Sequence, residues 1–287
     1  NGKSLKWTTG TAESSYDADE YIYITQKIEA QNLQHLQYGN SNAEAITISF
    51  YVRSSITGTF AIGLYKPDTT ARIFNKTYAI SSANTWEKKT LTFVGDTDSG
   101  AGIVNDNGQG LWVSWHLAAG SNATGGGSNG AWENYGGLTD WADGQATNAV
   151  MTTSSATWQM TECQVEVGSQ ATPFEHRSYG EELRLCQRYF QKIGAGYYAA
   201  NAVGTTKLST GFPLATAIRA APSSVTAPTS EFHRSGNQNS SSATIDAIVL
   251  SHNNSFLNLR LTGFSSLTDE VAQVVYNNNE MSIDAEL

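Results

Sequence analysis

The chain has 287 residues, 15% of them charged, and a formal net charge of −9. Because this charge comes without a clustered face of lysine and arginine, it argues against a nucleic-acid partner. Only two cysteines are present, too few for a disulfide scaffold, and no apolar run approaches the ~20 residues that a membrane span requires.

The first part of the chain alternates apolar and polar residues with the period of a half-buried strand. In residues 45–55, Ile46, Ile48 and Phe50 fall on one face, and Thr47 and Ser49 fall on the other. The same pattern recurs in four later segments, at 59–66, 85–95, 110–117 and 158–168. Strands that follow one another without an amphipathic helix predict a jelly roll or another β-sandwich. Residues 28–36 fit either a strand or a helical turn that follows one.

The acidic turns offer weak candidates for a structural Ca²⁺ site. Asp96, Asp98 and Asp106 lie close together in the sequence, and Asp17, Asp19 and Glu20 form a second acidic group. Calcium takes six to eight oxygen ligands from such loops. Neither group has the spacing of an EF-hand, so solvated turn residues remain the alternative.

A glycine-rich insertion interrupts the strand pattern at about residues 119–148 and contains several aromatic residues. Sugar rings stack on aromatic faces while their hydroxyls bond to amides and carboxylates. The candidate glycan-binding residues are therefore Trp132, Asn134, Tyr135, Asp140, Trp141 and Asp143. In the alternative interpretation, the rings fold back over the sandwich or pack against a neighbouring subunit.

A helix is predicted over residues 178–192. Ser178 and Glu181 form a capping box at its start, and Gly194 follows its end. Leu183, Cys186 and Phe190 share one face, which we expect to be buried and to take part in assembly. Cys163 and Cys186 are interpreted as two small core residues, with a disulfide between them left open.

The strand pattern resumes after this helix, at residues 211–218, 243–250, 255–261 and 270–276, with an exposed loop predicted at 231–242. The sequence therefore predicts an all-β protein with three parts. These are an N-terminal jelly roll of the carbohydrate-binding-module type at 1–177, a connecting helix at 178–192 and a smaller C-terminal β-sandwich at 193–287.

The common catalytic motifs are missing from the sequence. There is no G-x-S-x-G elbow, no H-E-x-x-H pair and no complete P-loop, and the five histidines are scattered. A pair of carboxylates could still meet in the fold, but the sequence favours a protein without an enzymatic activity. The chain opens at Asn1 without a methionine, so we expect a processed or partial product.

Several segments resemble virion proteins of tailed bacteriophages, namely tail-fibre or minor structural proteins. The resemblance covers nearly the whole chain and is most specific over ATPFE through CQRYF, residues 171–190; other segments include ITQKIEAQNL, TWEKKTLTF and FPLATAIRAAPSSV. The first half is also similar in style to carbohydrate-binding modules of secreted glycoside hydrolases. The resemblance implies a virion component, expected as a homotrimer contacting other virion proteins, and brings no catalytic residue.

Three hypotheses follow from the sequence. The first is a phage fibre or appendage protein whose jelly roll adheres to a host cell-surface glycan, with no nucleic-acid partner and no membrane insertion. The second is a non-catalytic carbohydrate-binding module of a secreted polysaccharide-degrading enzyme. The third is a capsid decoration protein without a ligand. Tail fibre, head fibre and capsid decoration stay open, as does the identity of the sugar.

Overall fold

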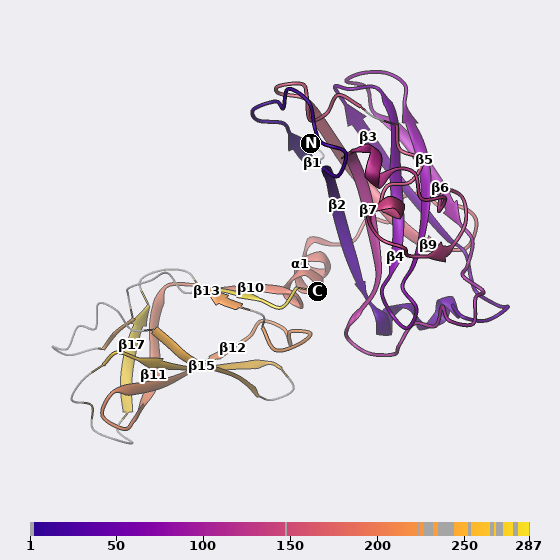
Figure 1. Cartoon of the computed structure of the whole chain (residues 1–287). Coiled ribbons are helices and arrows are strands. Elements are labelled where there is room, and N and C mark those ends of the chain that lie inside the picture. Colours follow the sequence, from indigo (N-terminus) through magenta and orange to yellow (C-terminus); the bar gives the residue numbers. More distant parts are fainter. Residues whose placement is uncertain are drawn as a thin grey trace. The chain divides into compact units, whose positions relative to one another are not determined.

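The computed structural model shows an all-β chain that divides into two compact units, residues 1–175 and 176–287 (Figure 1). The residues that it describes are 3–146, 148–222, 224–226, 232–234, 244–251, 254–264, 267, 272–277 and 281–286. In the part that is described, no helix is both long enough and apolar enough to span a membrane. Each unit is described by itself below.

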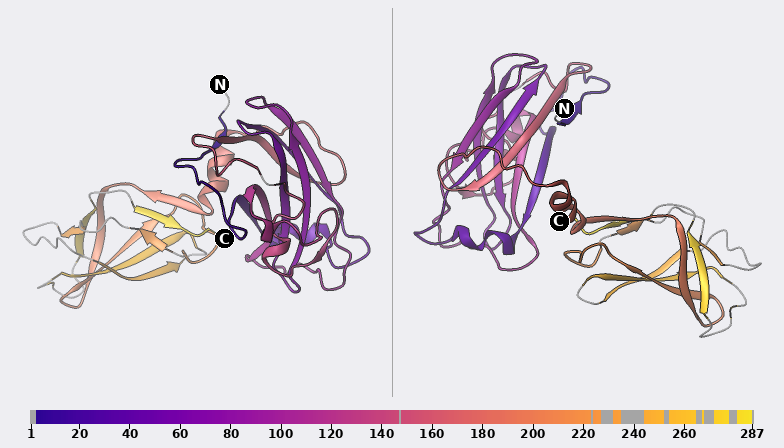
Figure 2. Two further views of the ribbon diagram at one scale, coloured as in Figure 1. Left: turned by 45° about the horizontal axis from the view of Figure 1, so that its top comes forward. Right: turned by 180° about the vertical axis from the view of Figure 1, so that it is seen from behind.

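The first unit consists of two antiparallel sheets. Its strands are β1 (Leu5–Thr8), β2 (Tyr21–Glu29), β3 (Ile46–Ser54), β4 (Gly58–Lys66), β5 (Arg72–Ile80), β6 (Glu87–Phe93), β7 (Gln109–Ala119), β8 (Glu133–Asn134) and β9 (Thr157–Val167). One sheet has the order β1-β9-β3-β6, and the other has the order β2-β7-β4-β5-β8. Most successive strands pass from one sheet to the other. Figure 2 shows these strands from two further sides.

The core of this unit is formed by residues that alternate along the strands of both sheets. Ile48 and Phe50 of β3 and Phe60 and Leu64 of β4 are fully buried, as the period-2 pattern predicts. The Phe50 ring packs edge-on against that of Trp115, with centroids 6.1 Å apart. The segment at 28–36 contains both predicted structures, because β2 runs to Glu29 and the 3₁₀ helix η1 (Ala30–Leu36) follows.

The second unit begins with the only α-helix among the described residues, α1 (Tyr179–Gln187). Its strands are β10 (Phe190–Ile193), β11 (Gly196–Val203), β12 (Lys207–Pro213), β13 (Ser224–Thr226), β14 (Phe232–Arg234), β15 (Thr244–Ser251), β16 (Phe256–Thr262), β17 (Ala272–Asn277) and β18 (Met281–Asp284). They form two sheets, β10-β18-β13 and β14-β17-β11-β12-β16-β15. The core between them includes Leu208, Leu257 and Ile283. The predicted loop at 231–242 lies outside the described residues except for β14.

Helix α1 begins as predicted but ends earlier and is not buried. Ser178 and Glu181 form the capping box, with the Ser178 hydroxyl accepting from the Glu181 amide. The helix ends at Gln187, because the aromatic segment after it pairs as β10 with β18. The prediction that Leu183, Cys186 and Phe190 are buried is therefore wrong, since all three are exposed. Cys163 is partly buried against the core, and both cysteines are free thiols.

Candidate functional site

The outward face of the five-stranded sheet carries aromatic side chains where a solvated sheet would carry polar ones. Tyr65 of β4 and Lys27 of β2 both lie opposite Trp112 of β7 in the strand register. Their neighbours along the strands, Leu64 and Val113, are buried in the core, so Tyr65 and Trp112 point away from it. The Lys27 ammonium lies 4.4 Å from the centroid of the Trp112 ring.

The glycine-rich insertion lies over this outward face. It contains two 3₁₀ turns, η2 (Ser121–Ala123) and η3 (Leu138–Asp140), and the short strand β8, which pairs with β5. The buried Asn75 of β5 anchors it, because its amide nitrogen donates to the Asp140 carbonyl at 2.6 Å. A Cβ at Gly63 would lie 2.7 Å from Asn75 Oδ1. Glycine at this position therefore allows the insertion to approach the sheet.

Strands and insertion together line a groove of about 520 Å³. Its lining residues are Asp19, Tyr21, Tyr23, Tyr65, Trp112, Tyr135, Leu138 and Trp141. The rings hold one another edge-on: the centroid of Tyr65 lies 5.0 Å from that of Tyr135 and 5.3 Å from that of Trp112. Such contacts fix the orientation of each ring before a ligand binds. The volume lies within the range of small-molecule sites.

Four phenol hydroxyls of the groove are available to a ligand. Within the described part of the chain, the hydroxyls of Tyr21, Tyr23, Tyr65 and Tyr135 have no hydrogen-bond partner, and none of them is a buried atom. Burial raises the pKa of Tyr65 and of Tyr135 above the ordinary value of a phenol. Both hydroxyls therefore keep their proton at neutral pH and can donate as well as accept.

The segment before β2 places Asp19 at the groove. The amide of Gly120 donates to the Glu20 carbonyl at 2.8 Å, and that of Asn122 donates to the Ala18 carbonyl at 2.7 Å. A Cβ at Gly120 would lie 2.4 Å from the Asp17 carbonyl oxygen, so only glycine allows the two segments to run this close. Asp19 itself is exposed and is the one charged residue among those that line the groove.

His116 supports the floor of the groove from within. It is fully buried on β7, and its ring centroid lies 5.7 Å from that of Trp141. Burial lowers the pKa of His116 to about 3, because the imidazolium cannot be solvated there. The side chain is therefore neutral over the physiological range of pH.

Of the predicted glycan-binding residues, only Tyr135 and Trp141 line the groove. The Trp132 ring packs edge-on against Tyr38 and Phe74, and its indole nitrogen donates to the Val94 carbonyl at 2.7 Å. Trp132 thus covers the edge of the core, which was the alternative interpretation. Asn134 lies on β8, where its side-chain oxygen accepts from Arg72 Nη1 at 2.8 Å.

The two predicted carboxylates of the insertion organise its backbone and do not line the groove. Asp143 is buried and accepts from the amides of Gly127 and Asn129, at 2.9 and 2.7 Å. Asp140 is buried as well, and its carboxylate accepts from the Gly136 amide. These aspartates act as turn caps, because one carboxylate oxygen of each accepts from nearby backbone amides.

The three aspartates that were candidates for a Ca²⁺ site make hydrogen bonds to other groups of the first unit. Asp96 is buried, and its two carboxylate oxygens accept from Arg72 Nε at 2.7 Å and from Arg72 Nη2 at 3.0 Å. One oxygen of Asp98 accepts from the Gly100 amide, and one oxygen of Asp106 accepts from the Gly108 amide. Among the described residues, no three metal-ligating side chains of His, Cys, Asp or Glu gather in one place.

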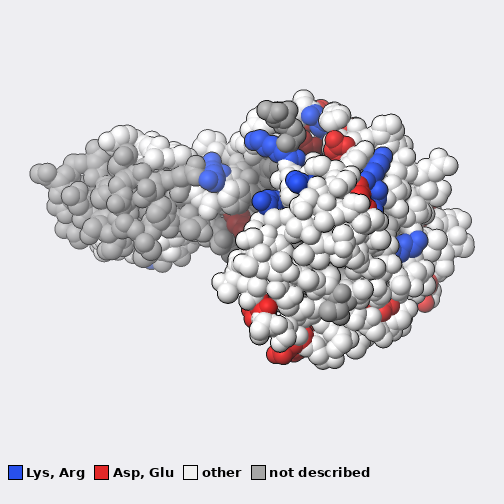
Figure 3. All heavy atoms as spheres, turned by 90° about the horizontal axis from the view of Figure 1, so that it is seen from above, with Lys and Arg blue, Asp and Glu red and all other residues white. Residues whose placement is uncertain are grey.

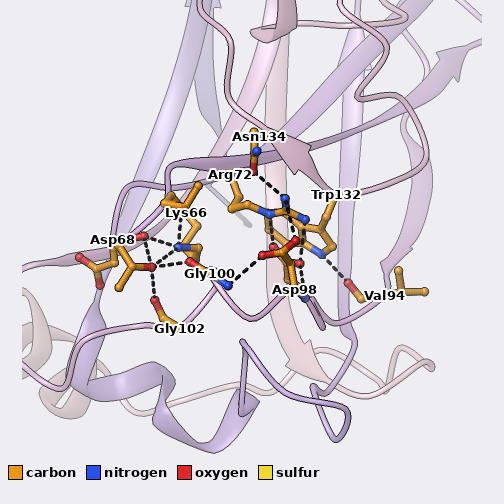
Figure 4. Close-up of polar contacts among 12 residues, drawn as sticks. Lys66, Asp68, Arg72, Val94, Asp98, Gly100, Gly102, Trp132 and Asn134 are labelled. Atoms are coloured by element: carbon orange, nitrogen blue, oxygen red, sulfur yellow. Dashed lines mark hydrogen bonds and ion pairs between the residues drawn. The ribbon is translucent and has the colours of Figure 1, made fainter.

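The Lys66 ammonium lies near Arg72 and donates hydrogen bonds to nearby carbonyl oxygens (Figure 4). Lys66 is fully buried, and its ammonium donates to the Asp68 and Thr70 carbonyls, the latter at 2.8 Å. Burial lowers the pKa of Lys66, against the opposing effect of nearby aspartates. Two cationic side chains therefore bond to oxygens of this region: Lys66 donates to carbonyls of residues 68 and 70, and Arg72 donates to the Asp96 carboxylate.

The sequence analysis missed most of the residues that line the groove, namely Asp19, Tyr21, Tyr23, Tyr65, Trp112 and Leu138. A signal was present in the strands: Tyr65 and Trp112 occupy outward positions where serine, threonine or lysine would be expected. The sequence does not show that these residues are neighbours, because only the strand register places residues from three strands side by side.

A second hollow lies elsewhere on the first unit. This larger hollow of about 720 Å³ is lined by residues 14–18, 120–121, 148–149 and 152, among which Tyr16 is the one aromatic residue. On the face seen in Figure 3, charged side chains of both signs are scattered over a largely uncharged surface of the first unit. Its aromatic lining therefore distinguishes the groove from this larger hollow.

No protein-family model and no curated protein matches this chain. The candidate site therefore stands on its own geometry.

Proposed function

We propose that the chain is a structural component of a phage particle, a tail fibre or another appendage, and that its first unit adheres to host surface glycans. The observation that supports adhesion is the groove, in which aromatic rings and four unpartnered phenol hydroxyls face solvent together. A sugar offers C–H faces to such rings and hydroxyls to such phenols. The part played in a virion is supported by the sequence resemblance.

The groove would serve equally well in a carbohydrate-binding module of a secreted polysaccharide-degrading enzyme. The resemblance over residues 171–190 favours the virion protein. The coding sequence upstream of Asn1 tests the choice. A secretory signal and glycosidase motifs would support the enzyme module, whereas a particle-attachment domain would support the virion protein.

Adhesion is tested by a glycan array followed by titration of the bound sugar. Replacing Trp112 by alanine removes a stacking face, and we expect at least about a tenfold loss of affinity, which corresponds to about 1.4 kcal/mol. Trp86→Ala is the matched control, because Trp86 is 40% exposed and does not line the groove. Unchanged binding by the Trp112 variant, or a chain that binds no glycan on the array, would contradict the proposal.

We propose further that the second unit assembles subunits, most simply as a homotrimer. Leu183, Leu185 and Phe190 are exposed by 40%, 48% and 38%, so each has apolar area that an assembly could bury. Repeated weak glycan sites would then gain avidity. Sedimentation of the purified chain tests this. A monomer at micromolar concentration would contradict it, and a trimer that Leu185→Glu dissociates would support it.

A further inference from the structure

We infer that the groove selects glycans that carry protonated amino groups over acidic ones, and that Asp19 is the residue that sets this selectivity. This inference rests on the proposed function. It begins from the charge of the lining, in which Asp19 is the single ionised side chain and no lysine, arginine or histidine takes part. An acidic sugar placed here would bring a second negative charge toward a carboxylate with no cation between them.

The aromatic rings reinforce the same preference. The face of an aromatic ring carries negative potential and attracts an ammonium group within about 6 Å of its centroid. The chain itself provides an example, because the Lys27 ammonium lies 4.4 Å from the centroid of Trp112. Tyr65, Tyr135 and Trp141 offer further rings around the groove. An amino sugar would thus meet favourable ring faces as well as a carboxylate.

The surroundings of the groove add negative charge. Burial raises the pKa of Tyr135 most, followed by Tyr65 and Tyr21, and Asp140 raises it further. Glu133 and Asp143 belong to the same insertion, and the nearby cation, Arg72, is paired with Asp96. The Asp140 carboxylate thus adds to the negative charge of Asp19 near the groove, and the Lys27 ammonium over the Trp112 ring opposes it. Among the described residues, Lys27 is the cation that lies over a lining ring, and it does not itself line the groove.

Asp19 is held in place for this role. Two backbone hydrogen bonds fix the residues on either side of it, from Gly120 to Glu20 and from Asn122 to Ala18. The carboxylate is exposed, so a ligand amine reaches it without the cost of burying an unpaired charge. The contribution of such an exposed ion pair is modest, which suits a site that discriminates between sugars and gains its affinity from stacking.

The experiment compares three defined probes at about pH 6, where a sugar amine is protonated. They are the hexamers of glucosamine, N-acetylglucosamine and galacturonic acid, each titrated into the whole chain. We expect the glucosamine hexamer to bind about three- to fivefold more tightly than the N-acetylated one, the range that an exposed ion pair provides. This preference should shrink at high salt, and galacturonate should bind most weakly.

Asp19→Asn should bring the ratio of the two glucosamine-type affinities close to one. Glu162→Gln is the matched control, because it removes the same charge from an exposed position on β9, in the other sheet. The ratio compares two ligands on one variant, so a partial loss of folding does not alter its meaning. A preference that survives in Asp19→Asn, or tighter binding of galacturonate, would overturn the inference while leaving adhesion intact. If no hexamer binds, the inference is overturned, and if the chain also binds no glycan on the array, the proposed adhesion fails as well.

Discussion

The two sheets of the first unit share one alternating pattern but present different faces to the outside. The outward side of the four-stranded sheet carries polar residues such as Arg53 of β3 and Thr90 of β6. The five-stranded sheet presents Tyr65 and Trp112, and the insertion lies over it. The comparison teaches that binary patterning makes the sandwich, whereas the groove lies on the face where outward aromatic residues meet the insertion.

The largest expected difference between the faces concerns stability. Replacing Trp141 by alanine removes a ring that is 7% exposed and should lower the free energy of unfolding by about 3 kcal/mol or more. Thr90→Ala, at an exposed outward position of β6, should change it by less than about 0.5 kcal/mol. Urea denaturation of both variants measures the contrast. Equal effects would mean that the insertion does not pack on the sheet.

The buried ion pair at the edge of the five-stranded sheet should contribute more to stability than the ion pair on the other sheet. Arg72→Met leaves the buried Asp96 without its cation and should cost about 3 kcal/mol. Lys89→Met breaks the more accessible pair with Glu87 and should cost less than about 1 kcal/mol. Thermal unfolding of the two variants compares them. A larger loss for Lys89→Met would refute this ranking.

Lowering the pH should reduce the stability of the first unit through protonation of His116. Its folded pKa of about 3 lies below the usual value near 6.5, so the unfolded chain binds the extra proton first. Stability is therefore complete above about pH 6.5 and falls as the pH drops toward 3, by on the order of 3 kcal/mol. His116→Gln should flatten this part of the profile, measured by urea denaturation at each pH. A profile that is unchanged in the variant would contradict the assignment.

The hydroxyls of the groove should have a smaller effect, on affinity alone. Tyr65→Phe keeps the ring and removes one unpartnered hydroxyl, so binding of a glycan found on the array should weaken by about two- to fivefold. Tyr51→Phe, on the outward side of β3, is the control on the other face and should leave binding unchanged. If both variants bind like the parent chain, the phenol of Tyr65 does not contact the sugar.

The smallest effect should come from a chelator. Because Arg72 already neutralises Asp96, removing divalent cations should leave the melting temperature of the first unit unchanged within about 1 °C. Differential scanning calorimetry with and without EDTA measures this. A fall of several degrees, reversed by calcium, would show an ion bound through other oxygens.

The sequence by itself determined the all-β class, the capping box at Ser178 and the alternation that buries Ile48 and Phe50, because each of these depends on neighbours a few residues away. It also placed Tyr135 and Trp141 in the right insertion. It did not show that Asp140 and Asp143 cap turns, because the aspartates that cap turns and those that bind ligands look alike in a sequence.

Only the tertiary structure decided where the groove lies. Its lining comes from the segment before β2, three strands and the insertion, over more than a hundred residues of sequence. Strand register sets Tyr65 beside Trp112, and Gly63 and Gly120 let separate segments approach closely. These are long-range packing relations, which local patterns do not encode. The exposure of α1 has the same origin, since an apolar stripe is buried only where another surface covers it.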